Sequence, residues 1–314
     1  MVEKKVKEEN SKEDKDELNL KELISFVKEM QVFTKEGIFK NLLSVPSEKE
    51  KKVIHDFLLI AEDDLNSSLD LFKKEHYSNA VYFLQQSTEK LSKACAMNFL
   101  SMNSDSVKNT SHNTPKIYLN LFQNQQIKEL IEKLADIFPQ IDIKPLDTIK
   151  ERIESVGKKE TKVKYAKMST TELTILLDTC DKLMEIDIKE SFTDSLKKQY
   201  GTNLNTLLDD VISSVLTFFP EIDDHSEEIE LKKHVEENMG IVFDPLNNMI
   251  VTILPLYILG IIMYSHESFT RYPEEPISNL DYNNEFGIVK VFKRVWDIEE
   301  ELLIKLKSYI KNEN

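Results

Sequence analysis

The segment that decides the fold reads YSNAVYFLQQSTEKLSKA at residues 77–94, and it follows the shorter segment AEDDL at residues 61–65. Apolar residues recur at intervals of three and four through both, which is the period of a helix with one buried face. We predict one helix from residue 48 to about 74 and a second from 77 to about 102. Ser47 and Glu50 have the spacing of a capping box and mark the first start. The two apolar faces must then pack against each other.

The helical period continues in the rest of the chain. It is clearest at residues 171–183, 204–219 and 284–311, and it is interrupted by a polar loop at 103–113. No sustained alternation of period two is present, so we predict an all-α protein.

Composition excludes several classes of function. The 314 residues include only six glycines, and neither GxGxxG nor GxxxxGK[ST] occurs, which excludes the standard dinucleotide and P-loop sites. The two cysteines, Cys95 and Cys180, lie in apolar helical stretches, so we expect buried thiols and no metal site. The net charge of −15 argues against broad binding of a phosphate backbone, and we expect no DNA partner.

One uncharged apolar segment occupies residues 249–264, MIVTILPLYILGIIMY. It is shorter than the ~20 residues that a spanning helix needs, and it contains Pro255 and Gly260. We therefore expect a buried core helix, with membrane contact as the alternative, and no membrane partner. Residues 1–16 are charged and do not form a secretory signal, so we expect a cytoplasmic location.

The segments quoted above resemble the HEPN family, whose two opening antiparallel helices carry a similar pattern. Two later segments also resemble the family, Thr110-Ser111-His112 after the second helix and Thr270-Arg271-Tyr272-Pro273 near the end. The resemblance implies an up-and-down four-helix bundle with additional helices. The resemblance divides the core into a first half (48–124) and a second half (246–314), separated by a helical insertion (125–245). Charge and apolar spacing predict a charged tail (1–16) and an N-terminal helix (17–46) before them.

A polar stripe follows the second helix. Gln85, Glu89 and Ser92 lie at helical spacing, and Gln86, Lys90 and Lys93 repeat it one position later. Glu89 and Lys93 have the favourable i, i+4 order for an ion pair. Two interpretations stay open. The stripe is either an ordinary solvated face with intrahelical pairs, or it lines a cleft or a dimer contact beside a ligand.

Arginine is rare, and only Arg152, Arg271 and Arg294 occur. A guanidinium in a loop bounded by proline suits phosphate or carboxylate, and a histidine supplies a titratable group. In a four-helix bundle the loops that hold His112 and Arg271 can meet, so these two are the candidate catalytic residues. The candidate ligand-binding residues are Gln86, Lys90, Lys93, Lys108, His266 and Tyr272.

The resemblance implies a nucleotide- or RNA-binding module, in a defence or toxin–antitoxin context, that forms a homodimer and uses no cofactor. Many HEPN ribonucleases carry Arg followed by His after four to six residues, and this chain lacks that motif. A metal-independent ribonuclease that uses His112 with Arg271 or Lys108 is one alternative. A non-catalytic helical dimerisation or adaptor protein is the other.

Overall fold

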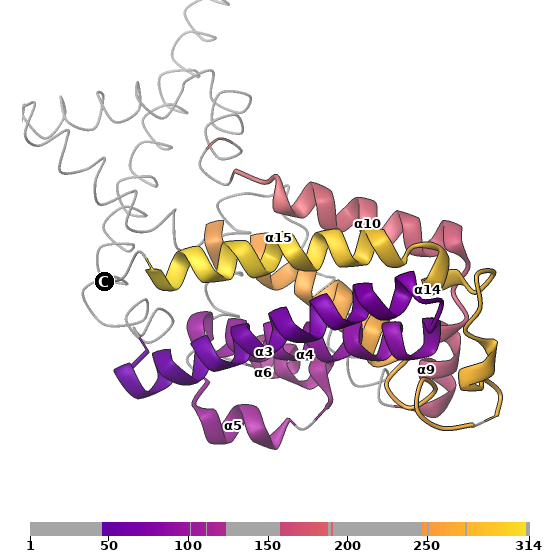
Figure 1. Cartoon of the computed structure of the whole chain (residues 1–314). Helices are drawn as coiled ribbons and strands as arrows, with labels where there is room; N and C mark the ends of the chain where they lie inside the picture. The colour runs from indigo at the N-terminus through magenta and orange to yellow at the C-terminus, as the bar shows by residue number, and fades with distance from the viewer. Residues whose placement is uncertain are drawn as a thin grey trace, which may run out of the picture. The chain divides into compact units, whose positions relative to one another are not determined.

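The computed structural model describes residues 46–100, 102–110, 112–123, 158–187, 190, 247–249, 251–273 and 275–311. The chain divides into two compact units, Met1–Leu42 with Lys189–Phe243, and Leu43–Ile188 with Asp244–Asn314. All described residues except Glu190 belong to the second unit, which alone is discussed below. Helices dominate and no β-strand occurs among the described residues, which confirms the all-α class (Figure 1).

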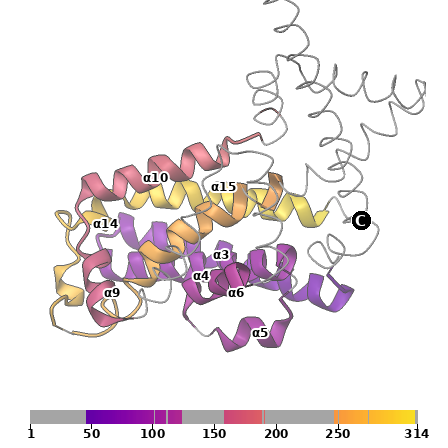
Figure 2. The same cartoon turned by 180° about the vertical axis from the view of Figure 1, so that it is seen from behind.

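Helices α3 (Glu48–Lys73) and α4 (Tyr77–Phe99) form the antiparallel pair that the sequence predicts. The capping box is confirmed, because the Ser47 amide donates to Glu50 Oε2 at 3.0 Å and the Glu50 amide donates to Ser47 Oγ. The two helices pack side by side (Figures 1 and 2). Their buried apolar side chains include Ile54, Leu58, Ala61, Leu65, Ala80, Val81, Leu84 and Leu91.

Helix α15 (Phe292–Lys311) packs against this pair. The rings of Phe72 and Phe292 stack with centroids 4.1 Å apart, and the Trp296 indole donates to the Leu65 carbonyl at 2.9 Å. The predicted single helix over 284–311 is corrected here, because α14 (Gly287–Lys290) ends at Val291 before α15 begins. Buried apolar residues continue through the break, so their spacing does not reveal it.

Helices α9 (Lys159–Ala166) and α10 (Thr170–Met184) follow in the chain, and α10 confirms the helix predicted at 171–183. Arg294 of α15 holds α10 through the carboxylates of Asp178 and Asp181, and the Asp178 contact is 2.5 Å long. Gly287 is required at the start of α14, because an added Cβ would lie 2.3 Å from the Met168 carbonyl oxygen.

Residues 247–264 form the apolar helix expected from the sequence. It is the one helix among the described residues that is long and apolar enough to cross a membrane, a test that buried core helices also pass. More than half of it is buried, and Leu256, Leu259 and Ile262 have no exposed surface. It crosses α6 (Thr114–Gln123) closely, since an added Cβ on Gly260 would lie 3.0 Å from Thr114 Cγ2. Cys95 and Cys180 are buried free thiols, as predicted.

Two parts of the sequence-based description need comment. The polar segment predicted as a loop contains helix α5 (Ser104–Asn109), which begins where the Asn103 side chain accepts from the Ser106 amide at 2.8 Å. The charged tail at 1–16, the helix at 17–46 and the helix at 204–219 lie outside the described residues. The boundaries of the predicted core halves and insertion stay predictions.

The acidic side chain of Glu299 is fully buried between helices. Glu299 of α15 has no exposed surface, and its Oε1 is hydrogen-bonded to Thr88 Oγ1 of α4 at 2.5 Å. Its Oε2 has no hydrogen-bond partner among the described residues. Burial raises the pKa of Glu299 to about 8, and the negative charge of Asp64 adds to the shift. Glu299 is therefore protonated at neutral pH.

We predict that Glu299→Gln stabilises the protein at pH 8. The pKa of Glu299 is higher in the folded state than in the unfolded state. The contribution of wild-type Glu299 to stability is therefore complete in acid and is lost as the pH rises towards 8. The free energy of unfolding of Glu299→Gln should therefore exceed that of the wild type at pH 8. This difference should grow with pH between pH 5 and 8, by up to about 1.4 kcal/mol per pH unit. Urea unfolding at several pH values measures this difference.

The matched control for this experiment is Glu300→Gln, which removes an exposed carboxylate from the next position of the same helix. Its effect on stability should be small and should not vary in this way with pH. An equal response of the two variants would contradict the assignment of a buried neutral acid at Glu299.

Candidate functional site

Helix α4 buries a run of polar side chains. Residues 85–89 and Ser92 are all buried, and the most exposed of them, Gln86, retains 8% of its surface. A buried polar group without a partner costs about 1–3 kcal/mol. The stripe is therefore not an ordinary solvated face. Its partners come from both α4 itself and other segments, although Gln85 Nε2 and Ser87 Oγ have no hydrogen-bond partner among the described residues.

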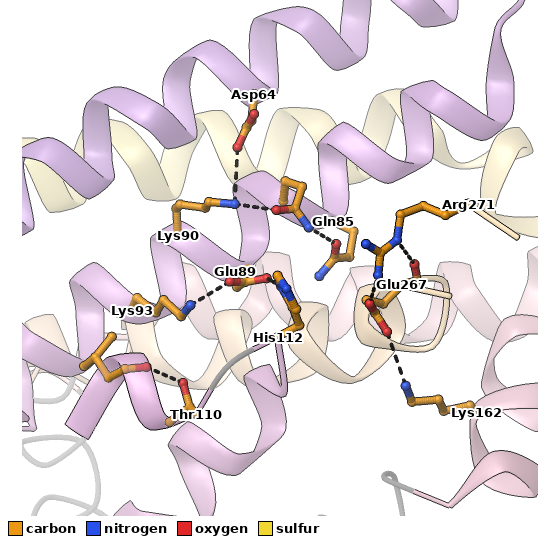
Figure 3. Close-up of polar contacts among 12 residues, drawn as sticks. Asp64, Gln85, Glu89, Lys90, Lys93, Thr110, His112, Lys162, Glu267 and Arg271 are labelled. Atoms are coloured by element: carbon orange, nitrogen blue, oxygen red, sulfur yellow. Dashed lines mark hydrogen bonds and ion pairs between the residues drawn. The ribbon is translucent and has the colours of Figure 1, made fainter. Parts of the chain in front are cut away.

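One line of contacts joins α4 to α3. Lys90 Nζ lies 3.7 Å from Asp64 Oδ2 and donates to Gln86 Oε1 at 2.5 Å, and Gln86 donates to Gln85 Oε1 at 2.6 Å (Figure 3). Burial raises the pKa of Asp64, and Lys90 opposes that shift. Gln86 and Lys90, two of the predicted ligand-binding residues, thus lie together.

A second cluster surrounds Glu89, whose side chain is 2% exposed. Lys93 donates to Glu89 Oε1 at 2.6 Å, which confirms the predicted ion pair, and His112 Nδ1 lies 2.9 Å from Glu89 Oε2 (Figure 3). Burial tends to raise the pKa of Glu89, but the hydrogen bonds from Lys93 and His112 outweigh it and the pKa is lowered. Glu89 is therefore an ionised carboxylate that holds two basic side chains.

A third cluster surrounds Glu267. Arg271 Nη2 pairs with Glu267 Oε1, Arg271 Nε donates to the Glu267 carbonyl at 3.2 Å, and Lys162 of α9 lies 3.6 Å from Glu267 Oε2 (Figure 3). The Arg271 guanidinium carbon lies 5.6 Å from the Tyr82 ring centroid and 5.3 Å from that of Tyr272, within cation–π range.

The second and third clusters lie along the same helix. Arg271 contacts Tyr82, and His112 contacts Glu89. Tyr82 and Glu89 are seven residues apart on α4, so their side chains share one face of the helix at a separation of about 10 Å. Figure 3 shows His112 and Arg271 on this flank, with Gln85 between them. Two candidate catalytic residues from distant loops are thus brought to one side of α4.

Exposure separates the basic residues into two groups. The side chains of Lys90, Lys93 and Lys162 are 17%, 11% and 14% exposed, and each is paired with a carboxylate. Those of Arg271 and His112 are 33% and 52% exposed. The lysines act as counter-ions for buried or partly buried carboxylates, while Arg271 and His112 are the more exposed basic groups of these clusters.

The other candidates lie elsewhere. His266 has no exposed surface, its Nδ1 is 2.7 Å from the Tyr282 hydroxyl, and burial lowers its pKa to about 3, so it is neutral and out of reach of a ligand. The structure thus corrects its proposed ligand contact. Lys108 is exposed on α5, and Tyr272 is exposed beside Arg271. No group of acidic, histidine or cysteine side chains in the described parts of the chain could hold a metal ion.

Sequence reasoning missed three members of this surface. Glu267 stands four residues before Arg271, a spacing that signals an ion pair within one helical turn. Tyr82 lies within the stretch that sets the fold, but its ring contact with a distant loop leaves no sequence signal. Lys162 comes from a helix far along the chain and likewise carries none.

We predict that Glu89→Gln destabilises the fold by about 3 kcal/mol, because it leaves a largely buried Lys93 without its charge partner. The matched control is Glu285→Gln. It breaks the Lys290–Glu285 pair, which has the same 2.6 Å separation but lies at the surface, and it should cost less than about 1 kcal/mol. Chemical denaturation measures both.

The pH dependence distinguishes charge from packing. Because the pKa of Glu89 is lowered in the folded state, its contribution is present at neutral pH and lost in acid. The difference between Glu89→Gln and the wild type should shrink as the pH falls. A constant difference would show that packing alone is lost.

The model of the HEPN domain matches residues 54–191 of this chain. The match covers most of α3 and all of α4, α5, α6, α9 and α10, and it ends before residues 246–314. The match thus extends into residues 125–245, the segment that we predicted to be an insertion. No curated protein and no solved structure matches the chain. The family match over residues 54–191 agrees with the motifs on α3 and α4 and with the all-α architecture, and this part of the chain is therefore similar to a HEPN domain.

Proposed function

We propose that this HEPN-like domain is a nucleotide- or RNA-binding module whose ligand lies along the flank of α4 between Arg271 and His112. The observation that carries the proposal is the convergence of these two accessible basic side chains on one helix face, two turns apart. Among the described residues no hydrogen bond involves Arg271 Nη1, so this nitrogen is available to donate to a phosphate oxygen.

Local charge supports a small anionic ligand. The flank contains Lys90, Lys93, Lys162 and Arg271 against Asp64, Glu89 and Glu267, so it is slightly positive in a chain of net charge −15. A slight local excess of positive charge suits a ligand with one or two phosphates, whereas the extended backbone of a nucleic acid needs a broad positive surface.

We predict that Arg271→Ala weakens the binding of fluorescein-labelled single-stranded RNA by about 10- to 100-fold, since hydrogen bonds to a charged group contribute roughly 1.5–3 kcal/mol. Fluorescence anisotropy gives the dissociation constants. The matched control is Arg294→Ala. Arg294 has the same 33% side-chain exposure and is also paired with carboxylates, those of Asp178 and Asp181, but its pairs join α15 to α10.

The salt dependence is a second readout of the same experiment. With one or two phosphate contacts, the slope of log K against log salt concentration should be no steeper than about −1.5 for a single strand. A much steeper slope, or an equal loss of affinity in the two arginine variants, would rule out a compact site at Arg271.

A second candidate function, a metal-independent ribonuclease, is favoured by one contact. Glu89 holds the Nδ1 side of His112, which leaves the other nitrogen of a half-exposed imidazole available for proton transfer. Arg271 on the same flank would stabilise the charge on the phosphoryl group.

We predict for this alternative that the wild type cleaves labelled RNA in the presence of EDTA and that both His112→Ala and Arg271→Ala abolish cleavage. Arg294→Ala should cleave at the wild-type rate. RNA binding by the wild type, with no cleavage by any of the proteins, would leave the binding module as the function. The homodimer and the defence or toxin–antitoxin context stay predictions.

A further inference from the structure

The loop that presents Arg271 is tied down at several points. The Ser78 hydroxyl at the start of α4 donates to the Thr270 carbonyl at 2.7 Å, and the Thr270 hydroxyl donates to the His266 carbonyl at 2.9 Å. The Tyr272 amide donates to the Ser268 carbonyl at 3.1 Å. At the base of the loop, the buried His266 is hydrogen-bonded to Tyr282. The loop therefore holds its side chains in a defined position before any ligand arrives.

An aromatic ring is exposed on this ordered loop. Tyr272 is 52% exposed, and the Arg271 guanidinium contacts both its ring and the ring of Tyr82. Most large aromatic side chains gain by burial, so a ring held at the surface beside a cation is a typical element of a recognition site. Aromatic rings and guanidinium planes are the groups on which unpaired nucleobases stack.

The position of Tyr272 relative to His112 defines the ligand further. Arg271 and Tyr272 lie at the Tyr82 end of the flank, and His112 lies two helical turns away at Glu89. One end thus offers an aromatic ring with a guanidinium, and the other an imidazole. A nucleotide chain presents the matching groups, a planar base and a phosphate, within a short length.

We propose that Tyr272 is a specificity-determining residue that stacks on an unpaired nucleobase, so that the site takes single-stranded RNA or a nucleotide and discriminates against phosphate-only anions and duplexes. This inference rests on the proposed function and names the ligand class for the same surface.

The test uses the full chain and three probes, a fluorescein-labelled single-stranded RNA, inorganic polyphosphate as a competitor, and an RNA duplex as a second competitor. The single strand should bind the wild type more tightly than either competitor. Tyr272→Leu should weaken single-strand binding by about 10-fold or more, whereas Tyr272→Phe, which retains the ring, should bind within about twofold of the wild type. Polyphosphate should bind all three proteins equally.

A matched control removes exposed apolar surface without removing a ring. Leu280 is 85% exposed, and Leu280→Ala should leave the affinity for RNA unchanged. A fluorescent base analogue such as 2-aminopurine in the single strand supplies a direct readout, because its emission changes on stacking and this change should be absent with Tyr272→Leu.

The outcomes separate the two proposals. Stacking on Tyr272 is overturned if Tyr272→Leu binds RNA as the wild type does. It is also overturned if this variant loses affinity for RNA and for polyphosphate to the same extent. In both cases phosphate binding by the wild type stands. If neither RNA nor polyphosphate binds the wild type, the proposed function fails and this inference fails with it.

Discussion

The burial of polar side chains on α4 is the constraint on which the rest of the described structure depends. Residues 85–89 are polar and buried in succession, so they face several directions around the helix and need partners from more than one neighbour. Thr88 is hydrogen-bonded to Glu299 on α15, and Glu89 to His112 in the loop before α6. Lys90, the next residue, pairs with Asp64 on α3. The Tyr118 hydroxyl of α6 adds another, since it donates to Ser92 Oγ at 2.9 Å. Helix α4 is thus joined to α3, α6 and α15 by specific polar contacts as well as by packing.

The same constraint shapes the surface. The buried carboxylate of Glu89 and the partly buried carboxylate of Glu267 need compensating cations, and Lys93 and Lys162 supply them. Each carboxylate also holds a second and more accessible basic side chain, His112 in one case and Arg271 in the other. The result is a pair of oriented basic groups on a flank that is slightly positive although the protein as a whole is acidic. Stability and the proposed binding therefore depend on the same residues.

Local features of the fold were predictable from the sequence. The capping box at Ser47 and Glu50, the pairing of α3 with α4 and the Glu89–Lys93 ion pair all depend on residues close together in the chain, where helical spacing sets the geometry. Helix α5 was missed because its few residues are polar and are also common in loops. The break at Val291 was missed because the apolar pattern continues through it.

The site was less predictable, for physical reasons. A polar stripe has the same residue spacing whether water or protein covers it. Only the structure therefore distinguishes a solvated stripe from a buried one. His266 and His112 are both histidines near loops, yet one is fully buried against Tyr282 and the other is half exposed. Tyr82 and Lys162 join the surface through contacts with residues more than 100 positions away, which no local pattern encodes.

The central claim is that a ligand lies along the flank of α4 between two loops. Amide hydrogen exchange with and without single-stranded RNA tests it most directly. The account predicts added protection in residues 112–114 and 268–273, with no change in α10 or on the outer face of α15. Protection that appears in α10 and α15 while both loops exchange as before would contradict it.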